Sequence, residues 1–345
     1  MRFALPFLSL LLPCLAENAP LNHFQVIGTH NSYHLAPGKA EETFIRLRGE
    51  AEVQGLSYSH PPLVEQFDAG IRQIELDLFA DREGGRYASP AVFQLSKIAG
   101  KEAPAPLLDP EGLMAKPGTK ILHFPNFDFR TNVLTLTTAL SDTLNWSLAH
   151  PKHHPIFIIL ELKGNSADWN DAGLRALEEE ILATVPRKHL ITPDDVRGEH
   201  HDLRTAILKK GWPSQDSLRG KLMLALDNTG TARTAYLKPD PLIEGRLLFP
   251  SCPSPNHPSA GWFKINDPVT HFDRIKALSQ KGFLIRTRAD AATREARTNH
   301  TNRRDKAFAS GAHFISTDFP KANPKFSDYQ VSLPEKTQEA YRFRR

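Results

Sequence analysis

The sequence is poor in cysteine, in long apolar runs and in clusters of like charge, and each shortage excludes a class of protein. Cys14 and Cys252 are its only cysteines, which excludes a scaffold held together by several disulfides. No apolar run reaches the ~20 residues that a membrane-spanning helix requires. Its 43 Lys and Arg residues nearly balance 39 Asp and Glu residues. The basic residues form no block except Arg342, Arg344 and Arg345, so we expect no nucleic-acid partner.

The sequence does contain enough apolar material for a large folded core. It has 345 residues, of which 40% are hydrophobic and 24% are charged. This composition excludes disorder as the general state of the chain. The 27 prolines favour long ordered loops over a helix bundle.

The first residues have the pattern of a secretory signal peptide. Arg2 precedes the apolar stretch Phe3 to Leu15, and the small residue Ala16 is followed by polar residues. A short basic start, an apolar segment and a small residue at the cleavage site define such a peptide. We therefore predict a signal peptide at residues 1–16 and a secreted or periplasmic location. Cleavage there leaves Cys252 as the one cysteine, so no intrachain disulfide is possible.

Short apolar runs bounded by turn or capping residues recur along the rest of the chain. Several are nearly continuous in Ile, Leu, Val and Phe, which is typical of strands buried on both faces of a parallel sheet. The runs cover residues 24–30, 71–79, 121–124, 155–163, 221–228, 247–252, 283–290 and 313–319.

Helical patterns lie between these runs. Asp171 is placed to cap one helix, and Thr192 followed by Pro193 is typical of the start of another. An apolar stripe at helical spacing is formed by Leu174, Leu177, Ile181, Leu182 and Val185. Alternation of helices with about eight strands predicts an α/β fold, a TIM-type (β/α)8 barrel. We expect residues 17–345 to form this single domain, with 87–119 as a long loop.

Polar residues interrupt the predicted strands at their carboxyl ends. In a closed barrel these ends meet at one rim, where the catalytic residues of this fold lie. Strand alternation places Glu75 and Asp77 on one face, and likewise Glu161 and Lys163. The residues expected at the rim are His30, Asn31, Glu75, Asp77, His123, Glu161 and Lys163.

These residue types suit one kind of chemistry. Carboxylates and an amide oxygen are hard donors that suit Ca²⁺ or Mg²⁺. Two histidines at the same rim can move protons on either side of a phosphodiester, and a metal on a phosphoryl oxygen adds Lewis-acid stabilisation. The rim residues therefore predict a metal-assisted phosphodiesterase.

Each of these residues also has a structural interpretation. Lys163 can simply neutralise its acidic neighbours. Arg286 and Arg288 either clamp substrate hydroxyls or phosphate oxygens or form ion pairs with Asp290 or Asp318. Several charges gathered on successive strand ends favour a site, because an unpaired buried charge costs several kcal/mol. Other polar residues are given less weight: Asp227 and Asn228 as substrate contacts or supporting residues, and His150, His153 and His154 as surface residues.

At these residues the chain resembles the Ca²⁺-dependent phosphoinositide-specific phospholipases C, especially their secreted bacterial and fungal class. The likeness extends over nearly the whole chain after the predicted signal peptide, in the same order. It is carried by residues 27–33, 70–77, 123–128, 130–131, 155–163, 192–198, 211–213, 286–290, 310–312 and 316–318.

The resemblance implies a distorted TIM-type barrel that cleaves phosphatidylinositol into diacylglycerol and a cyclic inositol phosphate, after attack by the inositol 2-hydroxyl. His30 and His123 match the catalytic histidines, with His30 expected to protonate the leaving group and His123 to stabilise the phosphorane. Glu161 or Glu75 is expected to take the 2-hydroxyl proton. The resemblance further implies Ca²⁺ ligands and a residue near the phosphate: Asn31, Glu75, Asp77 and Glu161 as ligands, and Lys163 at the phosphate.

No module for membrane attachment is evident, so we expect exposed apolar loops, with Trp262 and Phe263 as one candidate, to contact the lipid surface. No obligate protein partner is expected. Two other functions stay open. A glycerophosphodiester phosphodiesterase shares the barrel and the metal, although the pair His30–Asn31 favours the phospholipase. A catalytically silent inositol-lipid-binding protein is the second.

Overall fold

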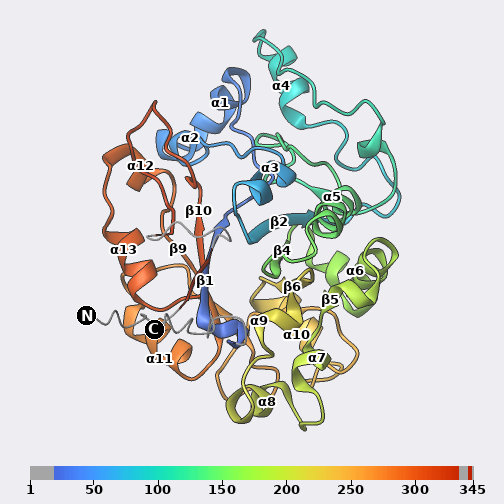
Figure 1. The fold of residues 1–345 in the computed structure, drawn as a ribbon. Coiled ribbons are helices and arrows are strands. Elements are labelled where there is room, and N and C mark those ends of the chain that lie inside the picture. The colour runs from blue at the N-terminus through green and yellow to red at the C-terminus, as the bar shows by residue number, and fades with distance from the viewer. Residues whose placement is uncertain (1–18, 334–340, 344–345) are drawn as a thin grey trace, which may run out of the picture.

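The computed structural model describes residues 19–333 and 341–343, and its centre is a ring of parallel strands enclosed by helices (Figure 1). Neighbouring strands pair in the order β1-β2-β4-β6-β7-β8-β9-β10, and β10 pairs with β1. One bridge, Ser251 with Trp262, joins the β7 and β8 segments. The eight parallel strands are β1 (Phe24–Thr29), β2 (Gln73–Phe79), β4 (Ile156–Leu162), β6 (Leu222–Leu226), β7 (Phe249–Pro250), β8 (Trp262–Lys264), β9 (Leu284–Arg288) and β10 (Phe314–Thr317).

This ring confirms the predicted TIM-type barrel. It is distorted, because β1 and β2 share one paired position, Gly28 with Gln73, and β7 is only two residues long. Gly28 is required at this point. A Cβ atom there would lie 2.0 Å from Oε1 of Gln73, whose side chain fills the space between the two strands.

Three further strands lie outside the ring. They are β3 (Lys120–Ile121), β5 (Leu190–Ile191) and β11 (Tyr341–Phe343). The prediction that residues 121–124 form a barrel strand was wrong: β3 runs antiparallel to β2. The third barrel strand along the chain is β4, so the polypeptide turns back along β2 before it reaches the next strand. β5 and β8 were not predicted from the sequence, because they are too short to give a periodic pattern.

Helices surround the ring on all sides (Figure 1). The α-helices are α1 (Lys39–Ile45), α2 (Glu50–Gly55), α3 (Leu63–Asp68), α4 (Ala91–Ile98), α5 (Leu136–Ala149), α6 (Asp171–Thr184), α7 (Pro193–Arg197), α8 (Leu203–Lys209), α9 (Gln215–Leu218), α10 (Gly230–Leu237), α11 (Phe272–Gln280), α12 (Arg294–Thr298) and α13 (Asn302–Ala309). The 3-10 helices are η1 (Leu21–His23), η2 (Arg46–Arg48), η3 (Leu113–Ala115), η4 (Ser166–Trp169) and η5 (Arg187–His189). Within the described ranges, no helix has the length and apolar character needed to cross a bilayer.

Local sequence explains the ends of the longer helices. The predicted stripe of α6 packs into the core through Leu174, Leu177 and Ile181. Its cap is Asn170 rather than the predicted Asp171, because the Asn170 side chain accepts a hydrogen bond from the backbone of Gly173. Thr192 caps α7 as predicted. Both caps satisfy backbone N–H groups that have no partner inside the helix.

Three other expectations differ from the structure. His153 and His154, predicted at the surface, are buried. Trp262 and Phe263, the candidate lipid contact, are also buried, because β8 is a strand of the ring. The long loop 87–119 contains α4 and packs a small second apolar cluster with residues of α1 and β2. The predicted signal peptide lies outside the described residues.

Candidate active site

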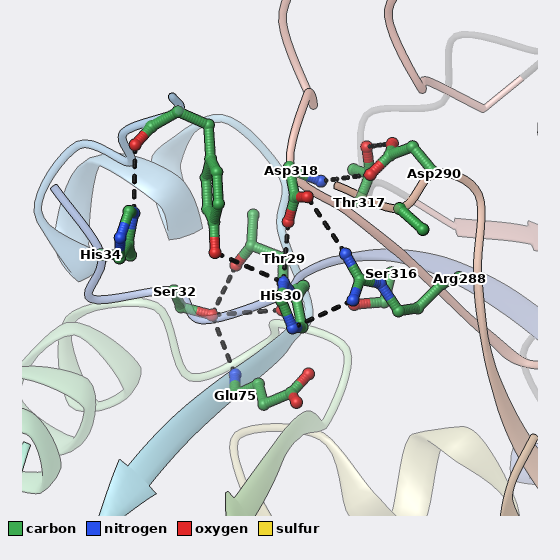
Figure 2. Close-up of polar contacts among 12 residues, drawn as sticks. Thr29, His30, Ser32, His34, Glu75, Arg288, Asp290, Ser316, Thr317 and Asp318 are labelled. Carbon is green, nitrogen blue, oxygen red and sulfur yellow. Dashed lines mark hydrogen bonds and ion pairs between the residues drawn. The ribbon is translucent and has the colours of Figure 1, made fainter. Parts of the chain in front are cut away.

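His30 directly follows β1, and the side chains of Asp318 and Arg288 hold its ring in place (Figure 2). Its Nδ1 atom lies 2.8 Å from Oδ1 of Asp318, and Nη1 of Arg288 lies 3.2 Å from its Nε2 atom. Arg288 also contacts Oδ2 of Asp318 at 3.1 Å. Burial, and then the charge of Arg288, holds the pKa of His30 well below its ordinary value. The imidazole is therefore neutral, donating from Nδ1 and accepting at Nε2.

His123 follows β3 and has its own carboxylate. Its Nδ1 atom lies 2.6 Å from Oδ2 of Asp128, and Nε2 of His34 lies 3.0 Å from the same oxygen. Burial disfavours the charged form of Asp128. The two histidines outweigh burial and lower its pKa to about 2. Asp128 is therefore an ionised carboxylate between two imidazoles.

The two histidines open onto one pocket of about 220 Å³. Asn31 lies in the same pocket and has a backbone φ of 44°, a left-handed conformation that Asn tolerates better than most residues. The turn at Asn31 carries the chain sharply away from the end of β1. The pocket is lined by His30, Asn31, Tyr58, His123, Phe124, Arg288 and Asp318, together with residues of α2.

Three carboxylates from adjacent strands form a cluster inside the rim. Oxygen atoms of Glu75, Glu161 and Asp227 lie within 4.8 Å of one another. Glu75 is on β2, Glu161 is on β4, and Asp227 follows β6, so strand order alone brings them together. Burial raises the pKa of Glu75 to about 7 and also raises that of Asp227, despite nearby basic side chains. Figure 2 shows Glu75 close to His30 and Ser32.

Basic side chains balance these carboxylates. Arg286 is hydrogen-bonded to Glu75, and Lys264 is hydrogen-bonded to Asp227. The Lys163 ammonium lies 2.8 Å from Oε1 of Glu161 and 3.2 Å from Oδ2 of Asp77. Burial opposes ionisation of Glu161, but the charge of Lys163 outweighs it and lowers the pKa of Glu161. Asp77 is fully buried and lies outside the three-carboxylate cluster.

The residues predicted for the rim fall into two groups. His30, Asn31, His123 and Arg288 share the pocket. The charged residues of the second group form two sets of ion pairs, Arg286 with Glu75 and Lys163 with both Glu161 and Asp77, and the closeness of Glu75 to Glu161 joins the two sets. His123 arrives through the antiparallel β3 rather than at the end of a barrel strand.

Three residues of the site were not predicted, or were given too little weight, from the sequence. Asp227 belongs to the carboxylate cluster, whereas the Asn228 side chain only bonds the backbone of Leu162 in β4. The signal for Asp227 was its place at a strand end. Lys264 was missed because β8 was missed, and His34 carried no signal beyond its spacing of four from His30.

The fold and site together define a (β/α)8-barrel enzyme with paired acid–base groups beside a cluster of oxygen donors. Residues 19–342 match the family described as "Phosphoinositide phospholipase C, Ca2+-dependent". The chain belongs to this family, so it is a phosphoric diester hydrolase with Ca²⁺ as its cofactor, and membership implies an inositol-lipid substrate.

Solved structures share the fold. One is a calcium-dependent phosphoinositol-specific phospholipase C from Pseudomonas sp., described as a myoinositol complex, with 15% identity, a TM-score of 0.58, and coverage of 95% of this chain and 96% of that one. Another is a Ca²⁺-dependent phosphatidylinositol-specific phospholipase C from Streptomyces antibioticus, with 16% identity, a TM-score of 0.55, and coverage of 87% and 94%. No curated protein matches the sequence significantly.

The residues at the rim fit Ca²⁺. The cluster offers carboxylate oxygens, the ligands this ion prefers. Oδ1 of Asp227 is buried and accepts no hydrogen bond from any residue that the structure describes. A buried carboxylate oxygen without a donor is costly, and a bound cation would satisfy it.

Proposed function

We propose that this enzyme cleaves the bond between phosphorus and the glycerol oxygen of phosphatidylinositol, producing diacylglycerol and a cyclic inositol phosphate. One observation carries the proposal. His30 and His123, each hydrogen-bonded to a carboxylate through Nδ1, share one pocket beside the carboxylate cluster. This arrangement provides two separately held proton-transfer groups at a single phosphodiester.

Glu75, Glu161 and Asp227 are the proposed core of the Ca²⁺ site. Asn31 and Asp77 are further candidate ligands. When bound, Ca²⁺ supplies Lewis-acid stabilisation of the charge that develops on phosphorus oxygens. Asp227 is an addition to the ligand set predicted from the sequence, and the closeness of its oxygens to Glu75 and Glu161 supports it.

The hydrogen bonds support proton-transfer roles opposite to those expected from the sequence. His30 carries its proton on Nδ1, so Nε2 can accept the proton of the inositol 2-hydroxyl once the Arg288 guanidinium, which contacts Nε2 in this structure, turns to the phosphate. The 2-oxygen then bonds to phosphorus, and the bond from phosphorus to the glycerol oxygen breaks. His123, in its doubly protonated form with its Nδ1–H on Asp128, donates its Nε2 proton to that oxygen, which leaves as diacylglycerol, and the ring becomes neutral. Glu75 and Glu161 are already engaged by Arg286 and Lys163, so we assign them to the cation rather than to the 2-hydroxyl.

The basic residues of the site differ in solvent exposure, and we assign each a role that fits its exposure. Arg288 lines the pocket and contacts His30, which suits it to a phosphate oxygen. Arg286 is fully buried against Glu75, so we assign it to holding that carboxylate. Lys163 is about a quarter exposed, so it can both neutralise Asp77 and reach a bound phosphate.

The pocket mouth is the proposed lipid-facing surface, in place of the buried Trp262 and Phe263. Leu47 in η2 is 83% exposed, and Phe124 beside His123 is 42% exposed. The guanidinium of Arg48 lies over the Phe124 ring at 5.7 Å. Exposed apolar side chains next to a basic one suit an anionic lipid surface.

Phosphorus NMR of the products, with and without Ca²⁺, tests the proposal. We expect phosphatidylinositol to give a cyclic phosphate resonance only when Ca²⁺ is present. Activity confined to deacylated glycerophosphoinositol would instead support a glycerophosphodiester phosphodiesterase. Lipid binding without any product would support a silent binding protein. A secreted or periplasmic location stays a prediction, tested by N-terminal sequencing of the exported protein.

A further inference from the structure

His34 lies in the core of the site but does not line the pocket. Its side chain is fully buried and stacks on the Tyr58 ring with 4.4 Å between centroids. Its Nδ1 atom lies 3.1 Å from the Tyr58 carbonyl oxygen, and its Nε2 atom lies 3.0 Å from Oδ2 of Asp128. A carbonyl and an ionised carboxylate only accept hydrogen bonds. Both ring nitrogens of His34 therefore have to donate.

An imidazole that donates from both nitrogens carries a positive charge. The buried carboxylate of Asp128 thus faces one charged ring, His34, and one ring at the pocket, His123. We propose that His34 is a positioning residue. It is a buried imidazolium that neutralises Asp128, so that this carboxylate orients the His123 ring without making His123 hold its proton too tightly. The inference rests on the proposed role of His123 as the proton donor to the leaving group.

The electrostatic reason follows from the geometry. A lone buried carboxylate at 2.6 Å would strongly favour the charged form of His123, and an acid that holds its proton too tightly is a poor donor. The His34 and His123 ring centroids lie 5.8 Å apart, edge to face. The charge of His34 opposes a second charge at this distance. Asp128 is then free to set the orientation of the ring.

Other charged or titratable groups surround His123, and they come from several elements. Asp128 lies five residues further along the same loop, His34 lies on the turn after β1, and His30 lies at the end of β1. Arg48 of η2 reaches the ring of Phe124, which packs on His123 at 4.2 Å. Of these groups, only His34 and His123 bond the carboxylate of Asp128.

The test follows the His123 ring by NMR in the Ca²⁺-loaded protein. In His34→Gln, we expect the titration midpoint of His123 to rise by about one pH unit, because Asp128 is no longer neutralised. In the double variant His34→Gln/Asp128→Asn, the rise should disappear. Tyr58→Phe is the matched control, because it keeps the carbonyl that His34 contacts, and it should leave the midpoint unchanged.

An unchanged or lowered midpoint in folded His34→Gln would overturn the inference. If that variant does not fold, the unaltered protein still decides the question, because nitrogen chemical shifts at neutral pH show whether both His34 nitrogens carry hydrogen. A single protonated nitrogen would also overturn it. Neither readout depends on turnover, whereas unchanged turnover in His123→Ala would overturn the proposed function alone.

Discussion

The Asp318 carboxylate, at the end of β10, accepts a hydrogen bond from Nδ1 of His30, at the end of β1, at 2.8 Å. The two residues are 288 positions apart in sequence, and they meet because β10 pairs with β1 to close the ring. Asp318 is itself held in place, since its backbone N–H donates to Asp290 and Arg288 contacts its second oxygen. The carboxylate thus fixes which nitrogen of His30 carries the proton.

Asp318→Asn is expected to lower kcat on the order of a hundredfold. The amide can present its NH₂ group to His30, which favours the tautomer with its proton on Nε2 and so blocks proton uptake there. Turnover of phosphatidylinositol in mixed micelles measures the effect. Asp305→Asn, an exposed change on α13, should retain full turnover. If the Asp318 variant did so as well, the hydrogen bond would have no catalytic consequence.

Asp227→Asn is expected to weaken Ca²⁺ binding by at least about tenfold, or about 1.4 kcal/mol. The change removes one of the three clustered carboxylates while it preserves the size of the side chain. Calorimetric titration with Ca²⁺ measures it directly. The control is Asp273→Asn, at an exposed position on α11. Equal affinity in both variants would exclude Asp227 from the ligand set.

Lys264→Met is expected to have the opposite effect. The ammonium of Lys264 pairs with Asp227, so it competes with a cation for the same carboxylate. Its removal should tighten Ca²⁺ binding by about tenfold, because a like charge a few ångströms away no longer opposes the ion. The same titration applies, with the exposed Lys281→Met as control. Weaker binding in Lys264→Met would mean that Lys264 supports the site rather than competes for it.

Leu47→Ser is expected to weaken binding to phosphatidylinositol vesicles by about tenfold. Burial of a leucine side chain in lipid contributes roughly 1.5–3 kcal/mol. Sedimentation with vesicles measures the affinity, and turnover of a soluble short-chain substrate should stay unchanged. Leu148→Ser is the matched control, because Leu148 is also exposed but lies near the end of α5, before β4 begins. Equal vesicle binding by the Leu47 and Leu148 variants would mean that the pocket mouth does not contact the lipid.

The sequence allowed the barrel and much of the rim to be predicted, because both depend on local patterns. The continuous apolar run of β4 and the alternation of Glu75 with Asp77 in β2 can be read within a few residues. Other features depend on contacts that are distant in sequence. β8 is three residues long and is a strand only because β9 pairs with it, so Lys264 could not be assigned to the site.

Pairing among charged residues was the least predictable part of the site. For Arg286 the sequence left two interpretations open, a clamp on substrate or phosphate oxygens and an ion pair with Asp290 or Asp318. In the structure Arg286 contacts neither carboxylate and is bonded to Glu75, 211 residues away. The structural interpretation of Lys163 as a neutralising residue is supported by its contacts with Glu161 and Asp77.

The buried His153 predicts how stability changes with pH. Its Nε2 atom lies 2.7 Å from Oγ of Ser147 and its Nδ1 atom lies 2.6 Å from the carbonyl oxygen of His154. Burial lowers the pKa of His153 from 6.5 to about 4. Below pH 6.5 the unfolded chain binds a proton at this histidine and the folded chain does not. Stability is therefore lost as the pH falls from 6.5 towards 4, by about 1.4 kcal/mol per pH unit for one histidine.

Urea unfolding at about pH 7 and about pH 5 measures this slope. His60, whose pKa burial also lowers to about 4, contributes with the same sign, whereas Glu75, whose pKa burial raises to about 7, contributes with the opposite sign. The contribution of His153 is therefore read from the difference between the slopes of the variant and the unaltered protein. His153→Gln should reduce the slope by about one proton, whereas His271→Gln, at an exposed position, should not change it. Equal slopes in all three proteins would mean that His153 takes up its proton equally well in the folded and unfolded chains, contrary to the effect of its burial.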